Sequence, residues 1–224
     1  TAGPLVARQI EVLYVSMLGK QVAPDLLEKI TGVESDVEKS FNTFRGQIDG
    51  RQVTTNEIKE ILRSSTKEPE LKAAWEAQKA VGALVAPRLK ELVKLRNQVA
   101  RELGYRDYYA LRIAENEQDE DDLLDLFDEL DDLTRGPFLE RKAEVDRRLA
   151  KRLGIGVEAL MPWHYQNPFF QEPPAVFETG LDALYRKHDT LKVCRSFYES
   201  FGMEVKGILE RSDLYEKEGK TPHP

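Results

Sequence analysis

Apolar side chains recur at spacings of three and four residues over most of this chain, which is the period of an α-helix. The clearest stripe follows Pro24, a residue that suits the first turn of a helix because its missing N–H costs nothing there. The stripe contains Leu26, Leu27, Ile30, Val33, Val37, Phe41 and Phe44. Because strand-like alternation never lasts beyond a few residues, we predict an all-α fold of long antiparallel helices.

The same spacing predicts helices along most of the chain. They are expected over residues 4–20, 24–44, 54–62, 69–103 with a kink at Pro87, 105–115, 119–153 with a kink or join at Gly136-Pro137, 181–201 and 205–214. We expect residues 1–224 to form a single helical region in four parts. These parts are helices at 1–65, a long-helix core at 66–154, an aromatic segment at 155–175, and helices with a polar tail at 176–224.

Charge and composition exclude several classes of protein. The chain has 33 Lys and Arg against 40 Asp and Glu, a net charge of −7, so it lacks the basic excess of a nucleic-acid binder. No apolar run approaches ~20 residues, so we expect a soluble chain that spans no membrane. A single cysteine, Cys194, excludes an intramolecular disulfide framework. This is compatible with the cytoplasm and with the periplasm.

Metal ligands are scarce in the sequence. The three histidines, His164, His188 and His223, form no His-Glu-x-x-His motif, and on one helix Cys194 would point away from His188. We therefore expect no metal ligands and no catalytic residues in this chain. The acidic stretch 115–132 has two interpretations: a calcium-dependent module, or an acid-rich helix start followed by a solvated face. The second is favoured because leucines interrupt the carboxylates at helical spacing and no glycine stands within the stretch.

Residues 155–175 break the helical pattern. Proline bounds an aromatic run here, Trp163 to Phe170, and the residues that precede Pro162 and Pro168 are pushed toward extended backbone. The segment is therefore expected to be irregular or extended. Irregular aromatic segments between helices often line a cleft, although a hydrophobic plug between two helical layers would have the same composition.

Several pieces of sequence, in this order, resemble the N-terminal half of the angiotensin-converting-enzyme-like zinc peptidases, and their bacterial peptidyl-dipeptidase members in particular. The longest piece is LRNQVARELGYRDYY at residues 95–109. The others are LTRGPF at 133–138, PWHYQ at 162–166 and LYE at 214–216. The resemblance extends from about Gly19 to the end of the chain.

The resemblance implies an almost all-α, two-lobed enzyme whose N-terminal helices form a lid over a deep cleft. In that family a zinc ion bound by His-Glu-x-x-His and a downstream Glu activates the water that cleaves the peptide. It implies that this motif lies beyond the region that this chain resembles. We therefore expect the chain to be the lid and one lobe of such an enzyme, to bind no zinc itself and to be inactive alone.

The resemblance also implies roles for individual residues. Arg112 matches an arginine that helps to hold a chloride ion in the animal enzymes. Trp163 and Gln166 resemble a Trp-x-Gln pair whose Gln contacts the carboxylate of the substrate. Because two residues separate them here, that role falls either to Tyr165 or to Gln166.

Two functions of different classes follow from this reading. The first is the cleft and lid portion of a zinc-dependent peptidyl-dipeptidase-like metallopeptidase, with a peptide substrate and a missing C-terminal catalytic half as its partners. The second is a stand-alone helical module that binds a protein or peptide, with self-association through the apolar face that a missing half would otherwise cover.

Overall fold

The computed structural model describes residues 3–172, 174–176, 185, 187–215, 217 and 220. It separates two compact units, Thr1–Pro174 and Ala175–Pro224. The first unit holds α1 (Pro4–Leu18), α2 (Pro24–Thr43), β1 (Gly46–Ile48), β2 (Arg51–Val53), α3 (Thr55–Ser64), α4 (Glu68–Lys79), α5 (Val81–Glu102), α6 (Tyr108–Glu115), α7 (Glu120–Leu153) and the 3-10 helices η1 (Val157–Ala159) and η2 (Pro162–Tyr165). The prediction of an all-α fold is confirmed.

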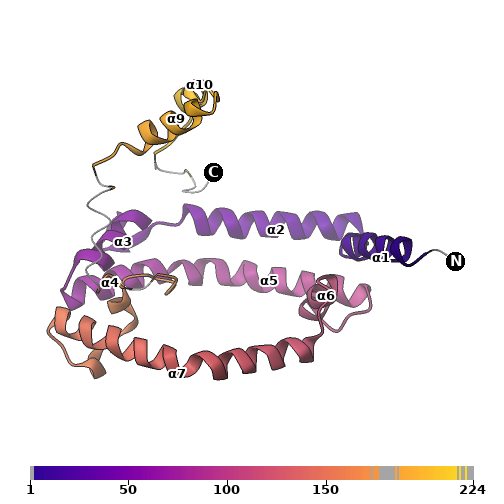
Figure 1. Ribbon diagram of the computed structural model, residues 1–224, viewed down its shortest axis with the longest axis horizontal. Helices are drawn as coiled ribbons and strands as arrows, with labels where there is room; N and C mark the ends of the chain where they lie inside the picture. Colours follow the sequence, from indigo (N-terminus) through magenta and orange to yellow (C-terminus); the bar gives the residue numbers. More distant parts are fainter. Residues whose placement is uncertain are drawn as a thin grey trace. The chain divides into compact units, whose positions relative to one another are not determined.

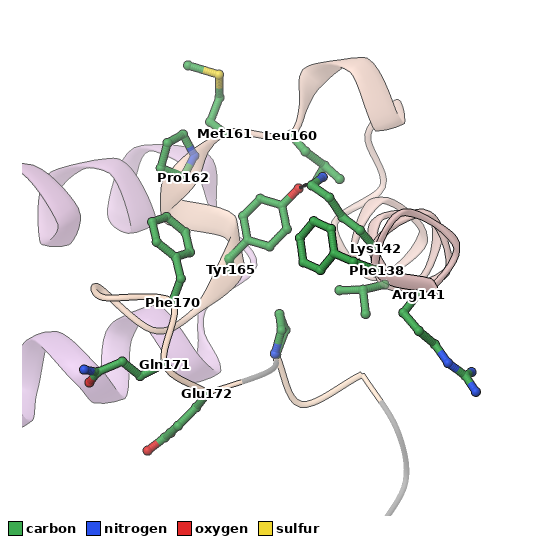
Figure 2. Close-up of a pocket in the computed structure, with 12 residues that line it drawn as sticks. Phe138, Arg141, Lys142, Leu160, Met161, Pro162, Tyr165, Phe170, Gln171 and Glu172 are labelled. Carbon is green, nitrogen blue, oxygen red and sulfur yellow. Dashed lines mark hydrogen bonds between the residues drawn. The ribbon is translucent and has the colours of Figure 1, made fainter. Parts of the chain in front are cut away.

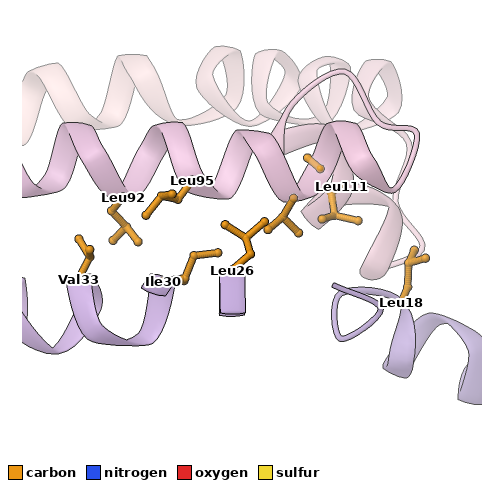
Figure 3. Close-up of a cluster of buried hydrophobic side chains, with 9 residues drawn as sticks. Leu18, Leu26, Ile30, Val33, Leu92, Leu95 and Leu111 are labelled. Atoms are coloured by element: carbon orange, nitrogen blue, oxygen red, sulfur yellow. The ribbon is translucent and has the colours of Figure 1, made fainter. Parts of the chain in front are cut away.

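The helices α2 and α5 lie side by side and antiparallel, and they form the longest packing interface of the first unit (Figure 1). Their buried side chains meet those of α6 and the end of α1 in one hydrophobic cluster (Figure 3). Its members are Leu18, Leu26, Ile30, Val33, Leu92, Leu95, Val99, Ala100 and Leu111. The apolar stripe after Pro24 therefore buries the face that its spacing predicts.

A second hydrophobic cluster joins the hairpin to α3 and α4. It consists of Val53, Ile58, Leu62, Leu71, Ala74 and Ala77. The helix α3 begins with a capping box, in which the Thr54 hydroxyl accepts from the Glu57 amide at 3.1 Å and the Glu57 carboxylate accepts from the Thr54 amide at 2.7 Å. The half-buried rings of Trp75 and Trp163 pack against this cluster, so it supports the aromatic segment.

The hairpin β1–β2 is a small addition to the predicted all-α fold, and each of its strands is three residues long. Ile48 and Arg51 pair across a two-residue turn, Asp49-Gly50, whose φ angles are 51° and 77°. Positive φ at both central residues is the geometry of the turn that joins such tight hairpins, and glycine accepts it without strain. Gly46 is required for packing, because a Cβ there would lie 2.8 Å from the carbonyl oxygen of Ala77 on α4.

Two predictions about helix continuity are corrected by the structure. The helix expected over residues 69–103 is two helices, since α4 ends at Lys79 and α5 begins at Val81. The helix α7 passes through Gly136 and Pro137 as one element, so these residues are not a join. Residues 162–165, within the segment predicted to be irregular or extended, form a short 3-10 helix.

The acid-rich helix start is confirmed at α7. Asp119 is its N-cap, and one carboxylate oxygen of Asp119 accepts from the amides of Asp121 and Asp122 at 2.9 and 3.1 Å. The buried residues of this 34-residue helix are Asp146, Leu149 and Ala150, which all lie near its C-terminal end.

The second unit holds α9 (Thr190–Ser200) and α10 (Lys206–Arg211). Both lie within predicted helices, although residues 181–184 and 186 of the first of these predictions fall outside the described residues. On α9 the ring of Phe197 packs edge-on against Phe201, with ring centroids 5.0 Å apart. Within the part of the chain that the structure describes, no helix has the length and apolar character that crossing a membrane requires.

Candidate functional site

The aromatic segment is tied to α4 by a shared carboxylate. The indole nitrogen of Trp163 on η2 donates to Oε1 of Glu68 at 2.9 Å. Oε2 of the same carboxylate is the hydrogen-bond partner of Nε2 of His164. Glu68 is the first residue of α4, where a negative charge is favoured by the helix dipole. One residue therefore fixes two neighbouring rings of η2.

The proton position on His164 follows from its two partners. Its Nδ1 accepts from the Met161 amide at 2.8 Å, so that nitrogen carries no hydrogen. The ring proton is therefore on Nε2, which donates to Glu68. Since the residue is only 3% exposed, the imidazole is a structural part of the turn and not a surface base.

Tyr165 joins η2 to α7 through a buried carboxylate. Its hydroxyl donates to Oδ1 of Asp146 at 2.7 Å, and the ammonium of Lys142 donates to Oδ2 at 2.6 Å and to the Tyr165 oxygen at 3.2 Å. Burial and the bond to Asp146 raise the pKa of the Tyr165 hydroxyl. The bond to Asp146 also raises the pKa of Lys142. The site therefore holds a charged lysine paired with a carboxylate, and a neutral phenol.

Two residues after η2 adopt backbone that non-glycine residues rarely use. Gln166 has φ 67° and Phe170 has φ 56°. The side chain of Gln166 donates to the carbonyl of Arg63 at the end of α3, at 3.3 Å. The ring of Phe170 lies against Trp75 and Tyr165, with centroids 5.7 and 6.1 Å away. Residues held in such conformations cluster at functional sites, so the turn is a candidate ligand-binding segment.

A cavity of about 560 Å³ opens between α7 and the segment that contains η2 (Figure 2). Its size is within the range of roughly 300–1,000 Å³ that is typical of ligand sites. Figure 2 shows the rings of Phe138, Tyr165 and Phe170 gathered around it. The lining residues are Phe138, Arg141, Lys142, Val145, Leu160, Met161, Pro162, Tyr165, Phe170, Gln171, Glu172 and Pro174.

The structure brings three of the predicted site residues into one segment and places the fourth elsewhere. Trp163, Tyr165 and Gln166 lie on or beside η2, and of these Tyr165 lines the cavity. Arg112 lies on α6, where its side chain is 55% exposed and pairs with Glu115 at 2.5 Å. Substrate binding by the first three and anion binding by Arg112 stay predictions.

Residues that the sequence analysis did not select complete the site. Glu68, Lys142 and Asp146 hold the two aromatic side chains of η2, and Phe138 and Phe170 form walls of the cavity. The sequence contains one pattern that could have indicated Lys142 and Asp146. The spacing of Lys142 and Asp146 is that of an ion pair on one helix face, and Asp146 stands next to the apolar positions Val145 and Leu149.

The described residues do not fit a zinc site. Among them, no group of three or more His, Cys, Asp and Glu side chains is placed so that it could hold a metal ion. The histidine nearest the cavity already has partners on both ring nitrogens. We therefore assign no metal-dependent step to the residues that the structure describes.

Comparisons with known proteins place the sequence in context. The family model described as angiotensin-converting enzyme, peptidase M2, matches residues 2–151. The angiotensin-converting enzyme-like protein Ace3 of Mus musculus is 35% identical over 136 residues, which is 57% of this chain. The chain spans 18% of the length of that relative. No solved structure matches.

Proposed function

This chain belongs to the angiotensin-converting enzyme family, and on that premise we propose that it is the lid and cleft portion of a zinc-dependent, peptidyl-dipeptidase-like metallopeptidase. The family match from residue 2 to residue 151, which covers α1 to most of α7, is the observation that carries this proposal. In this proposal the zinc ion, which supplies the water that attacks the peptide bond, is held by a C-terminal catalytic half outside these 224 residues. The bacterial type within the family is part of the same proposal.

The chain's own contribution is to bind and orient the peptide. The cavity beside η2 gives an apolar surface, and η2 presents polar groups next to it. We propose that the Gln166 amide contacts the carboxylate of the substrate, with Trp163 as the adjoining wall, or that the Tyr165 hydroxyl does so by exchanging its bond to Asp146 for one to the substrate. The Gln166 amide donates to the carbonyl of Arg63 at 3.3 Å, so a ligand carboxylate would replace that carbonyl as its acceptor.

Peptide binding tests this role directly. A fluorescein-labelled pentapeptide with a free C-terminal carboxylate is titrated with the full 224-residue chain, and its anisotropy is followed. Gln166→Ala should weaken binding about 10- to 100-fold, the loss of one hydrogen bond to a charged group. The matched control is Gln9→Ala on the exposed surface of α1. Equal loss in both variants, or no binding by the unmodified chain, would remove the proposed role.

Inactivity of the isolated chain needs its own assay. The purified protein is loaded with zinc and incubated with a quenched fluorescent peptide. We expect no hydrolysis above buffer. Hydrolysis that a chelator stops, and that follows the 25.6 kDa protein through a final sizing column, would contradict this part of the proposal.

Anion binding by Arg112 is a separate proposal. Because Glu115 already pairs with its guanidinium, we expect chloride to bind weakly to the isolated chain. Chloride-35 line broadening should fall in Arg112→Gln and persist in Arg88→Gln, a control at an exposed arginine of α5. Equal broadening in both variants would remove the assignment.

A second candidate function is a helical module that binds a protein or associates with itself. It is favoured by the exposure of large apolar side chains on two helices, among them Leu5 at 74% on α1 and Leu133 at 66% on α7. In the first proposal these faces contact the C-terminal half. Sedimentation velocity tests self-association: concentration-dependent dimers support it, and a monomer at all concentrations counts against it.

A further inference from the structure

We propose that the cavity between α7 and η2 is a specificity pocket for one large, uncharged apolar side chain of a bound peptide, and for an aromatic ring above others. This inference rests on the proposed function, because it names the kind of peptide that the cleft portion would select. It assigns a role to residues outside the predicted set, above all Phe138, Val145, Met161 and Phe170.

The walls of the cavity are mostly apolar. Phe138 and Val145 come from α7, Leu160 and Met161 precede η2, and Phe170 follows it. Several of these side chains are strongly exposed in the chain alone, with Phe138 at 61% and Phe170 at 58%. A ligand side chain that enters between them removes apolar surface on both partners from water, which is the main source of affinity in such sites.

The two cationic side chains that line the cavity, Arg141 and Lys142, already have acidic partners. The ammonium of Lys142 is bound to Asp146 at 2.6 Å and to Tyr165 at 3.2 Å, so a carboxylate ligand would have to compete with a buried carboxylate for it. Arg141 pairs with Glu144 at 3.1 Å, is 81% exposed, and points away from the cavity (Figure 2). The cavity therefore favours an uncharged group over an acidic one.

The aromatic walls are held in place before any ligand arrives. Tyr165 is fixed by its bond to Asp146, and the positive φ of Phe170 brings its ring against Trp75 and Tyr165. Rings held in this way lose little freedom on binding. They also offer edges and faces to an incoming ring, an arrangement that aromatic pairs prefer.

A peptide series tests the pocket. Fluorescein-labelled Gly-Ala-X-Ala-Gly peptides, with X as Phe, Leu, Ala or Glu, are titrated with the full chain. The Phe peptide should bind about 10- to 100-fold more tightly than the Ala peptide, the range expected for burying one large apolar side chain. The Glu peptide should bind no better than Ala. Equal affinity for Phe and Ala, or the tightest binding by Glu, would overturn the inference and leave the proposed peptide binding intact.

Variants locate the effect. Val145→Phe fills the cavity from α7 and should abolish the Phe preference, and Met161→Trp should do the same from the opposite wall if the first variant fails to fold. The control is Val93→Phe, the same substitution at a 49% exposed position of α5. Asp146→Asn should leave Lys142 without its charged partner and raise the affinity of the Glu peptide. A Phe preference that survives both filling variants would place the selectivity elsewhere and overturn the inference.

A small probe separates this inference from the proposed function. N-acetylphenylalaninamide is examined at millimolar concentration by saturation-transfer NMR. If the probe binds, Val145→Phe removes that binding and none of the peptides binds, the pocket is supported and the proposed peptide binding is overturned. Failure of the probe and of all the peptides overturns both.

Discussion

Glu68 and His164 are hydrogen-bond partners although 96 positions separate them in the sequence. The contact joins the first turn of α4 to the buried residue of η2. The other ring nitrogen of His164 accepts from the Met161 amide, and the other oxygen of Glu68 accepts from Trp163. The position of the aromatic segment thus depends on one carboxylate and one imidazole.

Replacing His164 by Ala should lower the free energy of unfolding by about 1–3 kcal/mol, because a ring that is only 3% exposed is removed and the Met161 amide loses its acceptor. Urea denaturation followed by circular dichroism measures the change. The control, His188→Ala, removes an exposed ring and should stay within about 0.5 kcal/mol of the unmodified chain. Equal stability of the two variants would show that the imidazole does not support the turn.

The Tyr165 hydroxyl should make stability depend on alkaline pH. Burial, and then the bond to Asp146, raises its pKa, and the bond to Asp146 raises the pKa of Lys142. A raised pKa means that the folded state holds the proton more tightly, so this stabilisation is complete below the unfolded-state pKa of about 10 and is lost above it. The free energy of unfolding should therefore fall more steeply above about pH 10 in the unmodified chain than in Tyr165→Phe.

The matched control for that series is Tyr14→Phe, because Tyr14 is 64% exposed on α1. Its curve should run parallel to that of the unmodified chain between pH 8 and pH 11. If Tyr165→Phe also gives a parallel curve, the phenol does not contribute to the pH dependence.

Truncating Leu111 to Ala should cost about 2–5 kcal/mol, since the side chain is 1% exposed in the cluster between α2, α5 and α6. The comparison is Leu13→Ala on α1, where the side chain is 59% exposed and little is lost. Thermal or urea unfolding gives both values. A cost below that of the surface variant would mean that this cluster is not the main core of the first unit.

Removing the N-cap hydroxyl in Thr54→Ala should cost about 1 kcal/mol. The Thr54 oxygen accepts from the Glu57 amide, and no other side chain of the capping box can replace it. Thr66→Ala, at an exposed position between α3 and α4, should be near neutral. Both variants are unfolded under the same conditions. If the curves of Thr54→Ala and Thr66→Ala coincide, the Thr54 hydroxyl does not stabilise the start of α3.

Apolar spacing was sufficient to predict where most helices lie, because each helix buries one stripe against a neighbour. The apolar spacing could not predict the break between α4 and α5, because the residue at the break is Ala80 and not a glycine or proline. There the chain changes partners, since α4 packs on α3 and β1 whereas α5 packs on α2. The dipeptide Asp49-Gly50 is typical of a tight hairpin turn. The two strands are only three residues each, which is too short for an alternation of apolar and polar residues to be recognised.

The candidate site was predicted only where it is continuous in sequence. The aromatic run was predicted from its composition, and Trp163, Tyr165 and Gln166 within it from their resemblance to a Trp-x-Gln pair. Its supports, Glu68 and Asp146, come from α4 and α7, and neither carries a local pattern that points to η2. Contacts between residues far apart in sequence are set by the packing of helices, which a single sequence does not report.

The burial of α7 at one end only has a consequence for how its backbone opens. Leu149 and Ala150 lie in the packed part, whereas residues 124–143 of the same helix are all exposed. Amide protons near Leu149 should exchange with deuterium only when the whole unit unfolds, and those near Leu130 should exchange through local fraying, orders of magnitude faster. Exchange rates along this single helix would then form a gradient, and a partner that covers the exposed part would flatten it.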